Sequence, residues 1–244
     1  MEIWKYIVLV LVVLLGGFGG ILFGSKRKVF LPIALSFTGA YILGITAMSL
    51  LPSVYIGASA KIGIWMLVGF LLQLAFESLS KGVEHGHIHA LHQEKQMVYV
   101  IQVLIGLSLH AFLEGLPISG IEEIGHQHQH HHEENLFWAI ILHKAPAAFA
   151  LSILLITNGL SRIKALLVLL LFALMTPMGA LVGSFWQANH EIMRIFLAIL
   201  IGAFFHISTL ILFENDKDSN QHHQFSILKM LIILFGFLLA YIVS

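Results

Sequence analysis

Residues 98–121 read VYVIQVLIGLSLHAFLEGLPISGI, an apolar run that contains one imidazole, His110, and one carboxylate, Glu114. About 20 apolar residues are enough for a helix to cross the roughly 30 Å of hydrocarbon in a bilayer, so this run predicts a transmembrane helix. Ionisable groups inside such a helix are costly and indicate a functional site by default. The middle of the chain is therefore its most informative part.

Apolar runs of this kind recur along the whole chain. The 244 residues are 58% hydrophobic and 11% charged, with a mean hydropathy of +0.91, which lies far outside the balance of a soluble domain. We predict an all-α integral membrane protein with eight transmembrane helices in a single domain, residues 1–244. The predicted spans are 4–24, 30–51, 62–82, 98–121, 136–157, 163–186, 192–213 and 226–243.

Two features of the composition exclude classes of function. The chain has no cysteine, which excludes disulfides, thiolate metal ligands and cysteine nucleophiles. Its formal net charge is zero, so nothing in the composition favours a nucleic-acid partner, and we predict none. The partner that the composition does indicate is the lipid bilayer.

The basic residues predict the orientation of the chain in the membrane. Cytoplasmic loops carry an excess of Lys and Arg, and these residues fall mainly in alternate loops of this chain. One side of the membrane would hold only Lys5, Lys61 and Arg194, and both termini belong to that side, so we predict that both termini lie outside the cytoplasm. The other side would hold Lys26, Arg27, Lys28, Lys81, Lys95, Arg162, Lys164, Lys217 and Lys229.

The ionisable residues of two successive spans form a candidate metal site. His110 and Glu114 are spaced i, i+4, which places them on one helix face within reach of a single ion. His143 in the next span could supply a third ligand, and imidazole with carboxylate suits Zn²⁺, Fe²⁺ or Mn²⁺. The alternative is a structural network in which Lys144 neutralises Glu114, and the histidines bond carbonyls freed by nearby prolines. The two interpretations are compatible in part, because a ligand and a counter-charge can share one cavity.

Two predicted loops, 83–97 and 120–135, are rich in histidine. Tracts of this kind are typical of flexible segments that bind or concentrate metal ions, although a solvated low-complexity spacer is the alternative. On the predicted topology the first loop is cytoplasmic and the second is external. The residues that we assign to auxiliary metal binding are His85, His87, His89, His126, His128 and His130.

Two other ionisable residues in predicted spans are left out of the core site. Glu77 lies near the end of its span, where its side chain can reach the membrane interface beside Lys81. His206 is interpreted as a packing residue, because a lone histidine in a membrane helix is more often satisfied structurally than bound to a metal.

Two short motifs resemble those of a known family. The segment His110-Ala111-Phe112-Leu113-Glu114-Gly115 is similar to the fourth-helix signature of the ZIP family of divalent-metal transporters. His143-Lys144-Ala145-Pro146 is similar to that family's fifth-helix signature. The resemblance implies a ZIP-like helical bundle, not an enzyme, that imports zinc or a related divalent transition metal by alternating exposure of a central site. It also implies a homodimer and a metal path through His110, Glu114 and His143.

The sequence departs from the family pattern at four positions. Ala111 stands where the family usually has Asn, Lys144 where it has an acid, Ala147 where it often has His or Glu, and Thr176 where some bacterial members have Glu. Most of these changes would remove ligands of a second metal. Our hypothesis is that the Lys144 ammonium takes the place of that second ion and pairs with Glu114, which leaves one metal in the path.

Two alternative functions stay open at this point. The lost ligands are compatible with a ZIP relative that binds or senses metal without transporting it. An intramembrane zinc-dependent hydrolase would also use His and acidic ligands, but it needs a separate general base, and no further buried acid accompanies Glu114. From the brevity of the chain and the missing ectodomain we expect a multi-pass protein of a cell membrane, namely a bacterial cytoplasmic membrane.

Overall fold

Helices account for all the regular secondary structure in the residues that the computed structural model describes, 2–24, 27–83, 96–120, 131–213 and 227–244. The predicted all-α class is therefore confirmed. The helices in chain order are α1 (Ile3–Phe23), α2 (Arg27–Ile45), the π-helical turn η2 (Thr46–Leu50), α3 (Leu51–Tyr55), α4 (Ile62–Ser80), α5 (Gln96–Gly115), α6 (His131–Thr157), α7 (Arg162–Ser184), α8 (His190–Phe213) and α9 (Ile227–Val243).

Seven of the described helical segments are long and apolar enough to cross a membrane. The eighth predicted span corresponds to α9, which is apolar but has only 17 residues. At 1.5 Å per residue it is roughly 26 Å long, a few ångströms short of the hydrocarbon thickness. The protein is thus a multi-pass membrane protein, and the outward orientation of its termini stays a prediction.

The second predicted span, 30–51, continues as helix to Tyr55 by way of a π-helical turn. The amide of Leu51 donates to the carbonyl of Thr46, five residues earlier. Pro52 follows at once and has no amide hydrogen, so the regular i to i−4 ladder cannot continue there. Widening by one residue lets the helix continue past this proline, and π-helical structure occurs mostly as such single turns inside α-helices.

The predicted span 98–121 is too long at its C-terminal end. Helix α5 ends at Gly115, and residues 116–120 form turns instead, with the amide of Leu116 donating to Leu113 and that of Ile118 to Gly115. Pro117 cannot donate to the carbonyl of Leu113, and it restricts the backbone of the residue before it. Conversely, α6 begins at His131, so the last five residues of the predicted loop 120–135 are helical.

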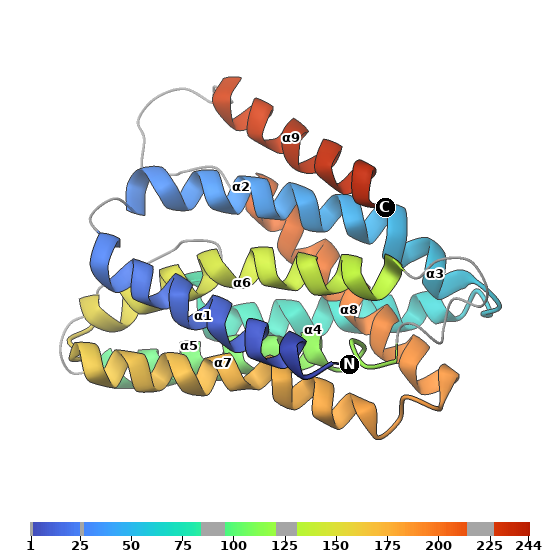
Figure 1. The fold of residues 1–244 in the computed structure, drawn as a ribbon, viewed down its shortest axis with the longest axis horizontal. Helices are drawn as coiled ribbons and strands as arrows, with labels where there is room; N and C mark the ends of the chain where they lie inside the picture. The colour runs from blue at the N-terminus through green and yellow to red at the C-terminus, as the bar shows by residue number, and fades with distance from the viewer. Residues whose placement is uncertain (1, 25–26, 84–95, 121–130, 214–226) are drawn as a thin grey trace.

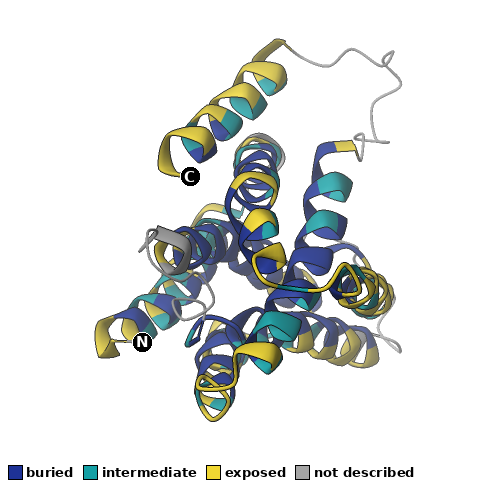
Figure 2. Ribbon diagram, turned by 90° about the vertical axis from the view of Figure 1, so that its right-hand side faces the viewer, coloured by how far each residue is buried: buried dark blue, intermediate teal, exposed yellow. Residues whose placement is uncertain are grey.

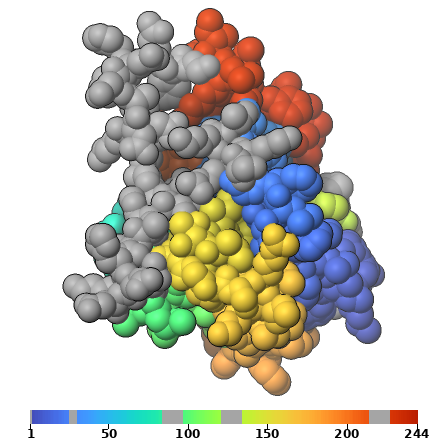
Figure 3. Space-filling view, turned by 90° about the vertical axis from the view of Figure 1, so that its left-hand side faces the viewer, coloured from blue at the N-terminus to red at the C-terminus, as the bar shows by residue number. Residues whose placement is uncertain are grey.

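The helices pack in two groups that lie against each other (Figure 1). In the first group, α1 packs on α6 and α7, and α5 packs on α7. In the second group, α4 packs on α8, and α2 packs on α8 and α9. The contacts of α4 with α5 and of α2 with α6 join the two groups. Figure 3 views the end of the bundle at which α6 ends and α7 begins.

Helix α6 is the most enclosed of the long helices, with 83% of its most apolar stretch buried, against 17% for α4. Figure 2 shows the buried residues gathered at the middle of the bundle and exposed ones on the outer helix faces. Because α6 has neighbours on nearly every side, its polar side chains are kept away from lipid. This is the helix that carries His143 and Lys144.

Glycines bring the backbones of several helix pairs close together. A methyl group on Gly16 of α1 would lie 2.5 Å from the carbonyl oxygen of Ala145, and one on Gly20 would lie 2.5 Å from that of Phe149. In lipid, where burial of apolar surface does not drive helices together, such small residues allow tight van der Waals packing. Helix α1 is therefore held closely against α6.

Candidate metal centre

Four ionisable side chains meet inside the bundle. His110 and Glu114 come from α5, and His143 and Lys144 come from α6; none of the four is more than 3% exposed. The Nε2 atom of His110 lies 2.9 Å from Oε1 of Glu114, and the Nζ atom of Lys144 lies 2.5 Å from Oε2 of the same carboxylate. Glu114 is therefore the residue that joins the two helices electrostatically.

Three of these residues are arranged as metal ligands. One ligand atom each from His110, Glu114 and His143 lie within 4.8 Å of one another, and no other group of three or more such residues occurs in the part of the chain that the structure describes. The two imidazole rings are nearly perpendicular, with centroids 6.1 Å apart. Two imidazole nitrogens and a carboxylate oxygen are donors that Zn²⁺ prefers, and a fourth position would be left to water.

The position of the site follows from local helix geometry and from glycine packing. The spacing of four residues puts His110 and Glu114 on one face of α5. A methyl group on Gly179 of α7 would lie 2.0 Å from the carbonyl oxygen of Phe112, so α7 holds this part of α5 backbone to backbone. Pro146 lies within α6, three residues after His143, without ending the helix.

Lys144 is a buried cation with two sources of stabilisation. Its ammonium pairs with Glu114 and also lies 5.1 Å from the centre of the Phe172 ring, at cation–π distance. An unpaired ammonium at 2% exposure would be strongly destabilising, because several kcal/mol of hydration are lost on burial. The ion pair expected in the structural-network interpretation is therefore present.

The other half of that interpretation is not supported. Both ring nitrogens of His143 are buried and have no hydrogen-bond partner among the described residues, and neither does Nδ1 of His110. Buried polar atoms are nearly always hydrogen-bonded, so unpartnered ones call for an explanation. A bound cation would satisfy one nitrogen of His143, which a purely structural network leaves without a partner.

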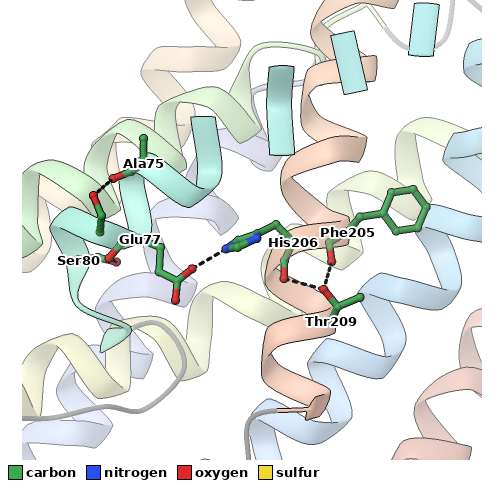
Figure 4. Close-up of polar contacts among 7 residues, drawn as sticks. Ala75, Glu77, Ser80, Phe205, His206 and Thr209 are labelled. Carbon is green, nitrogen blue, oxygen red and sulfur yellow. Dashed lines mark hydrogen bonds and ion pairs between the residues drawn. The ribbon is translucent and has the colours of Figure 1, made fainter. Parts of the chain in front are cut away.

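The structure brings together a second pair that sequence reasoning kept apart. Nε2 of His206 on α8 lies 2.5 Å from Oε2 of Glu77 on α4 (Figure 4). Glu77 therefore contacts a helix neighbour, whereas we predicted that it reaches the interface beside Lys81, and His206 has a more specific partner than general packing. The sequence offered only a weak indication of this contact. Each of the two residues is an ionisable group within a predicted span, and the two spans are predicted to run in the same direction.

The remaining predicted residues cannot be placed. The auxiliary loop histidines His85, His87, His89, His126, His128 and His130 lie outside the described residues.

Three of the positions at which the sequence departs from the family pattern are buried. Ala111, Ala147 and Thr176 are each at most 3% exposed.

Comparison with known proteins gives a consistent family assignment. The model of the ZIP Zinc transporter family matches residues 78–244. The chain is 26% identical over 156 residues to Zinc transporter ZIP1 of Danio rerio, covering 62% of this chain and 49% of that protein. It is 28% identical over 174 residues to Protein zntD of Dictyostelium discoideum, covering 64% of this chain and 24% of that protein. It is also 30% identical over 125 residues to Zinc transporter ZIP9 of Micropogonias undulatus, covering 50% and 38%.

The chain thus spans about half or less of the length of these curated relatives. All three come from eukaryotes, so they lend no support to the predicted bacterial membrane. The family model covers more than half of the chain, including α5 with His110 and Glu114 and α6 with His143. The chain belongs to the ZIP family.

Proposed function

We propose that this protein moves zinc or a related divalent transition metal across a membrane, in the direction of uptake into the cytoplasm. The observation that carries the proposal is the buried group His110, Glu114 and His143, whose ligand atoms lie within 4.8 Å of one another in the middle of the bundle. The relatives named as zinc transporters support it. The alternative of an intramembrane hydrolase gains no support, because the family to which the chain belongs is one of transporters.

The chemistry of the centre fits an ion that must also leave. Three protein ligands with water at a fourth position bind less tightly than a closed structural site of four protein ligands. His110 Nε2 and Glu114 Oε1 lie 2.9 Å apart, so an ion bound by both atoms would replace their mutual contact with two coordination bonds.

The Lys144 ammonium takes the position of a second ion in this proposal. It lies 2.5 Å from Glu114 and thus supplies positive charge to the carboxylate permanently. Ala111, Ala147 and Thr176 offer no imidazole or carboxylate, so the buried positions that would complete a second site carry no such ligand. A homodimer and metal capture by the loop histidines remain further parts of the proposal.

The first test is zinc uptake into proteoliposomes by the protein with His110→Gln and His143→Gln, each of which keeps the side-chain volume. Either change should lower flux at least tenfold, because one of three ligands is lost from a site that has few. His190→Gln, the same change at an exposed residue, should transport like the unmodified protein. Flux that survives in both site variants would exclude a path through this centre.

Absence of zinc flux in the unmodified protein would contradict the transport proposal itself. If zinc still bound with affinity that depends on His110, the metal-sensing alternative would replace transport. The departures at Ala147 and Thr176 are the observations that favour that alternative.

A second prediction concerns the lysine. Lys144→Ala should bind zinc more tightly, by at least tenfold, and transport it more slowly, because a nearby cation no longer competes for Glu114. Two unit charges 4 Å apart interact by about 4 kcal/mol at an effective dielectric constant of 20, which is ample for such a change. Zinc titration and flux would be measured on protein that elutes as a folded species in size-exclusion chromatography. Unchanged affinity and flux would contradict the substitution of an ion by the ammonium.

A further inference from the structure

A buried aromatic ring on α7 contacts the charged cluster of the metal centre. The centroid of the Phe172 ring lies 5.1 Å from Nζ of Lys144, and Phe172 is 2% exposed. In a membrane, burial of apolar surface does not drive helices together, because the lipid is as apolar as the ring. The inward position of this ring, beside a cation, therefore calls for a reason other than hydrophobic burial.

The Lys144 ammonium is held by two groups of different chemistry. Among the described residues its ion-pair partner is Glu114, whose Oε2 atom lies 2.5 Å from Nζ. An ammonium carries three N–H donors, so one carboxylate oxygen does not exhaust its capacity. The negative face of an aromatic ring attracts a cation, and it does so more strongly where water is excluded. The Phe172 ring is thus the second group that holds this ammonium.

The ring and the carboxylate come from different helices and from different levels of the bundle. Glu114 precedes Gly115 on α5, where a methyl group would lie 2.2 Å from the carbonyl oxygen of Thr176 on α7. Phe172 precedes Thr176 by four residues, so its backbone lies about 6 Å along α7 from that contact. Because the two groups belong to separate helices, an ion bound by Glu114 need not displace the ring.

Metal binding at the centre changes the surroundings of Lys144. A divalent ion bound by His110, Glu114 and His143 uses the same carboxylate that neutralises the ammonium, and it adds a repulsive charge nearby. A buried ammonium that loses its counter-charge is strongly destabilising. The face of the ring is not a metal ligand, so its attraction for the ammonium is kept while that of the carboxylate is shared.

We infer that Phe172 is a positioning residue for metal binding: its ring holds the Lys144 ammonium when a bound ion takes up the charge of Glu114. This inference rests on the proposed transport function. The ring contact stabilises the ion-bound protein more than the ion-free protein, so by linkage it raises the affinity of the centre for metal. Without the ring, the ammonium would compete fully for Glu114, and the ion would bind more weakly.

The test is Co²⁺ binding to the full-length protein in detergent, followed by the visible absorption of the ion. The signal of the centre is the part that disappears in His110→Gln with His143→Gln, which separates it from binding by loop histidines. Phe172→Leu should weaken Co²⁺ binding at the centre by roughly fivefold, because a desolvated cation–π contact is large enough for such a change. Phe204→Leu on α8, where the ring is 1% exposed, is the matched control and should bind Co²⁺ like the unmodified protein.

Two further measurements distinguish attraction of the cation from packing. In the Lys144→Ala background, Phe172→Leu should leave the Co²⁺ affinity unchanged, because the cation that the ring holds is absent. Replacement of Phe172 by phenylalanines with increasing numbers of ring fluorines should weaken binding step by step, because each fluorine draws electron density from the ring face and changes the volume little. The fluorinated proteins also carry the test if Phe172→Leu fails to fold.

Failure of this inference and failure of the proposed function give different results. An equal loss of affinity from Phe172→Leu with and without Lys144, or a fluorine series with constant affinity, would assign the ring a packing role. Either result would overturn the inference and leave the transport proposal intact. Absence of any Co²⁺ signal that depends on His110 and His143 would instead reject the metal centre, and both proposals with it.

Discussion

Replacing Glu114 by glutamine is expected to lower the free energy of unfolding by about 3–5 kcal/mol, the usual cost of removing one partner of a buried ion pair. Lys144 would stay charged at 2% exposure and would face a neutral amide where Oε2 of Glu114 now lies 2.5 Å away. The remaining contact of the ammonium with the Phe172 ring contributes about 0.5–2 kcal/mol, which is too little to offset the loss.

Adding Lys144→Met to Glu114→Gln should restore most of that stability. Replacing a buried ion pair by residues of similar volume is often neutral or stabilising, because neither charge then has to be desolvated. SDS-driven unfolding followed by circular dichroism would measure all three proteins. A Glu114→Gln variant within 1 kcal/mol of the unmodified protein would contradict the pairing, because another group would then have to neutralise Lys144.

Gly179→Ala should abolish zinc binding at the first centre, even though it adds only one methyl group. That methyl would lie 2.0 Å from the Phe112 carbonyl oxygen and 3.1 Å from the Cα atom of Gly115, both of them backbone atoms that cannot turn aside. Helix α5 would have to move away from α7 and would carry His110 and Glu114 with it. We expect zinc flux to fall more than tenfold.

Gly19→Ala is the matched control for this change. Its methyl group would meet Phe149 at 3.8 Å, an ordinary van der Waals contact, so binding and flux should be retained. Alanine is favoured over glycine in a helix interior by about 1 kcal/mol, so neither variant has a propensity reason to be harmful. Equal zinc binding in the two variants would show that the α5–α7 contact does not position the ligands.

The class of fold and the centre of the site were both predictable from local patterns. Apolar runs define the spans because hydrocarbon tolerates little else, and a spacing of four residues on α5 fixes the juxtaposition of His110 and Glu114. The ends of the helices were less predictable. The apolar run 98–121 does not reveal that Pro117 ends the helix at Gly115, because hydropathy is blind to the missing amide hydrogen.

The contacts between helices were the hardest to predict. His143 lies close to Glu114 because of how α5, α6 and α7 pack. From the sequence it was only a possible third ligand in the next span, and the motif resemblance strengthened that assignment. No such motif links Glu77 to His206, which are 129 residues apart in sequence. Their contact depends on the close packing of α4 against α8 through glycines. This packing could not be predicted from the sequence, because glycines are common in membrane helices.

The glycine contact of α1 with α6 also has a consequence for biosynthesis. Gly16 and Ala145 are packed together, yet about 130 residues of chain separate them, which a ribosome adds in roughly 6–26 s at 5–20 residues per second. Through that interval the glycine face of α1 has no α6 to pack against. The close contact of α1 with α6 therefore forms only after α6 is made, and Lys144 enters the membrane after Glu114 has already been made.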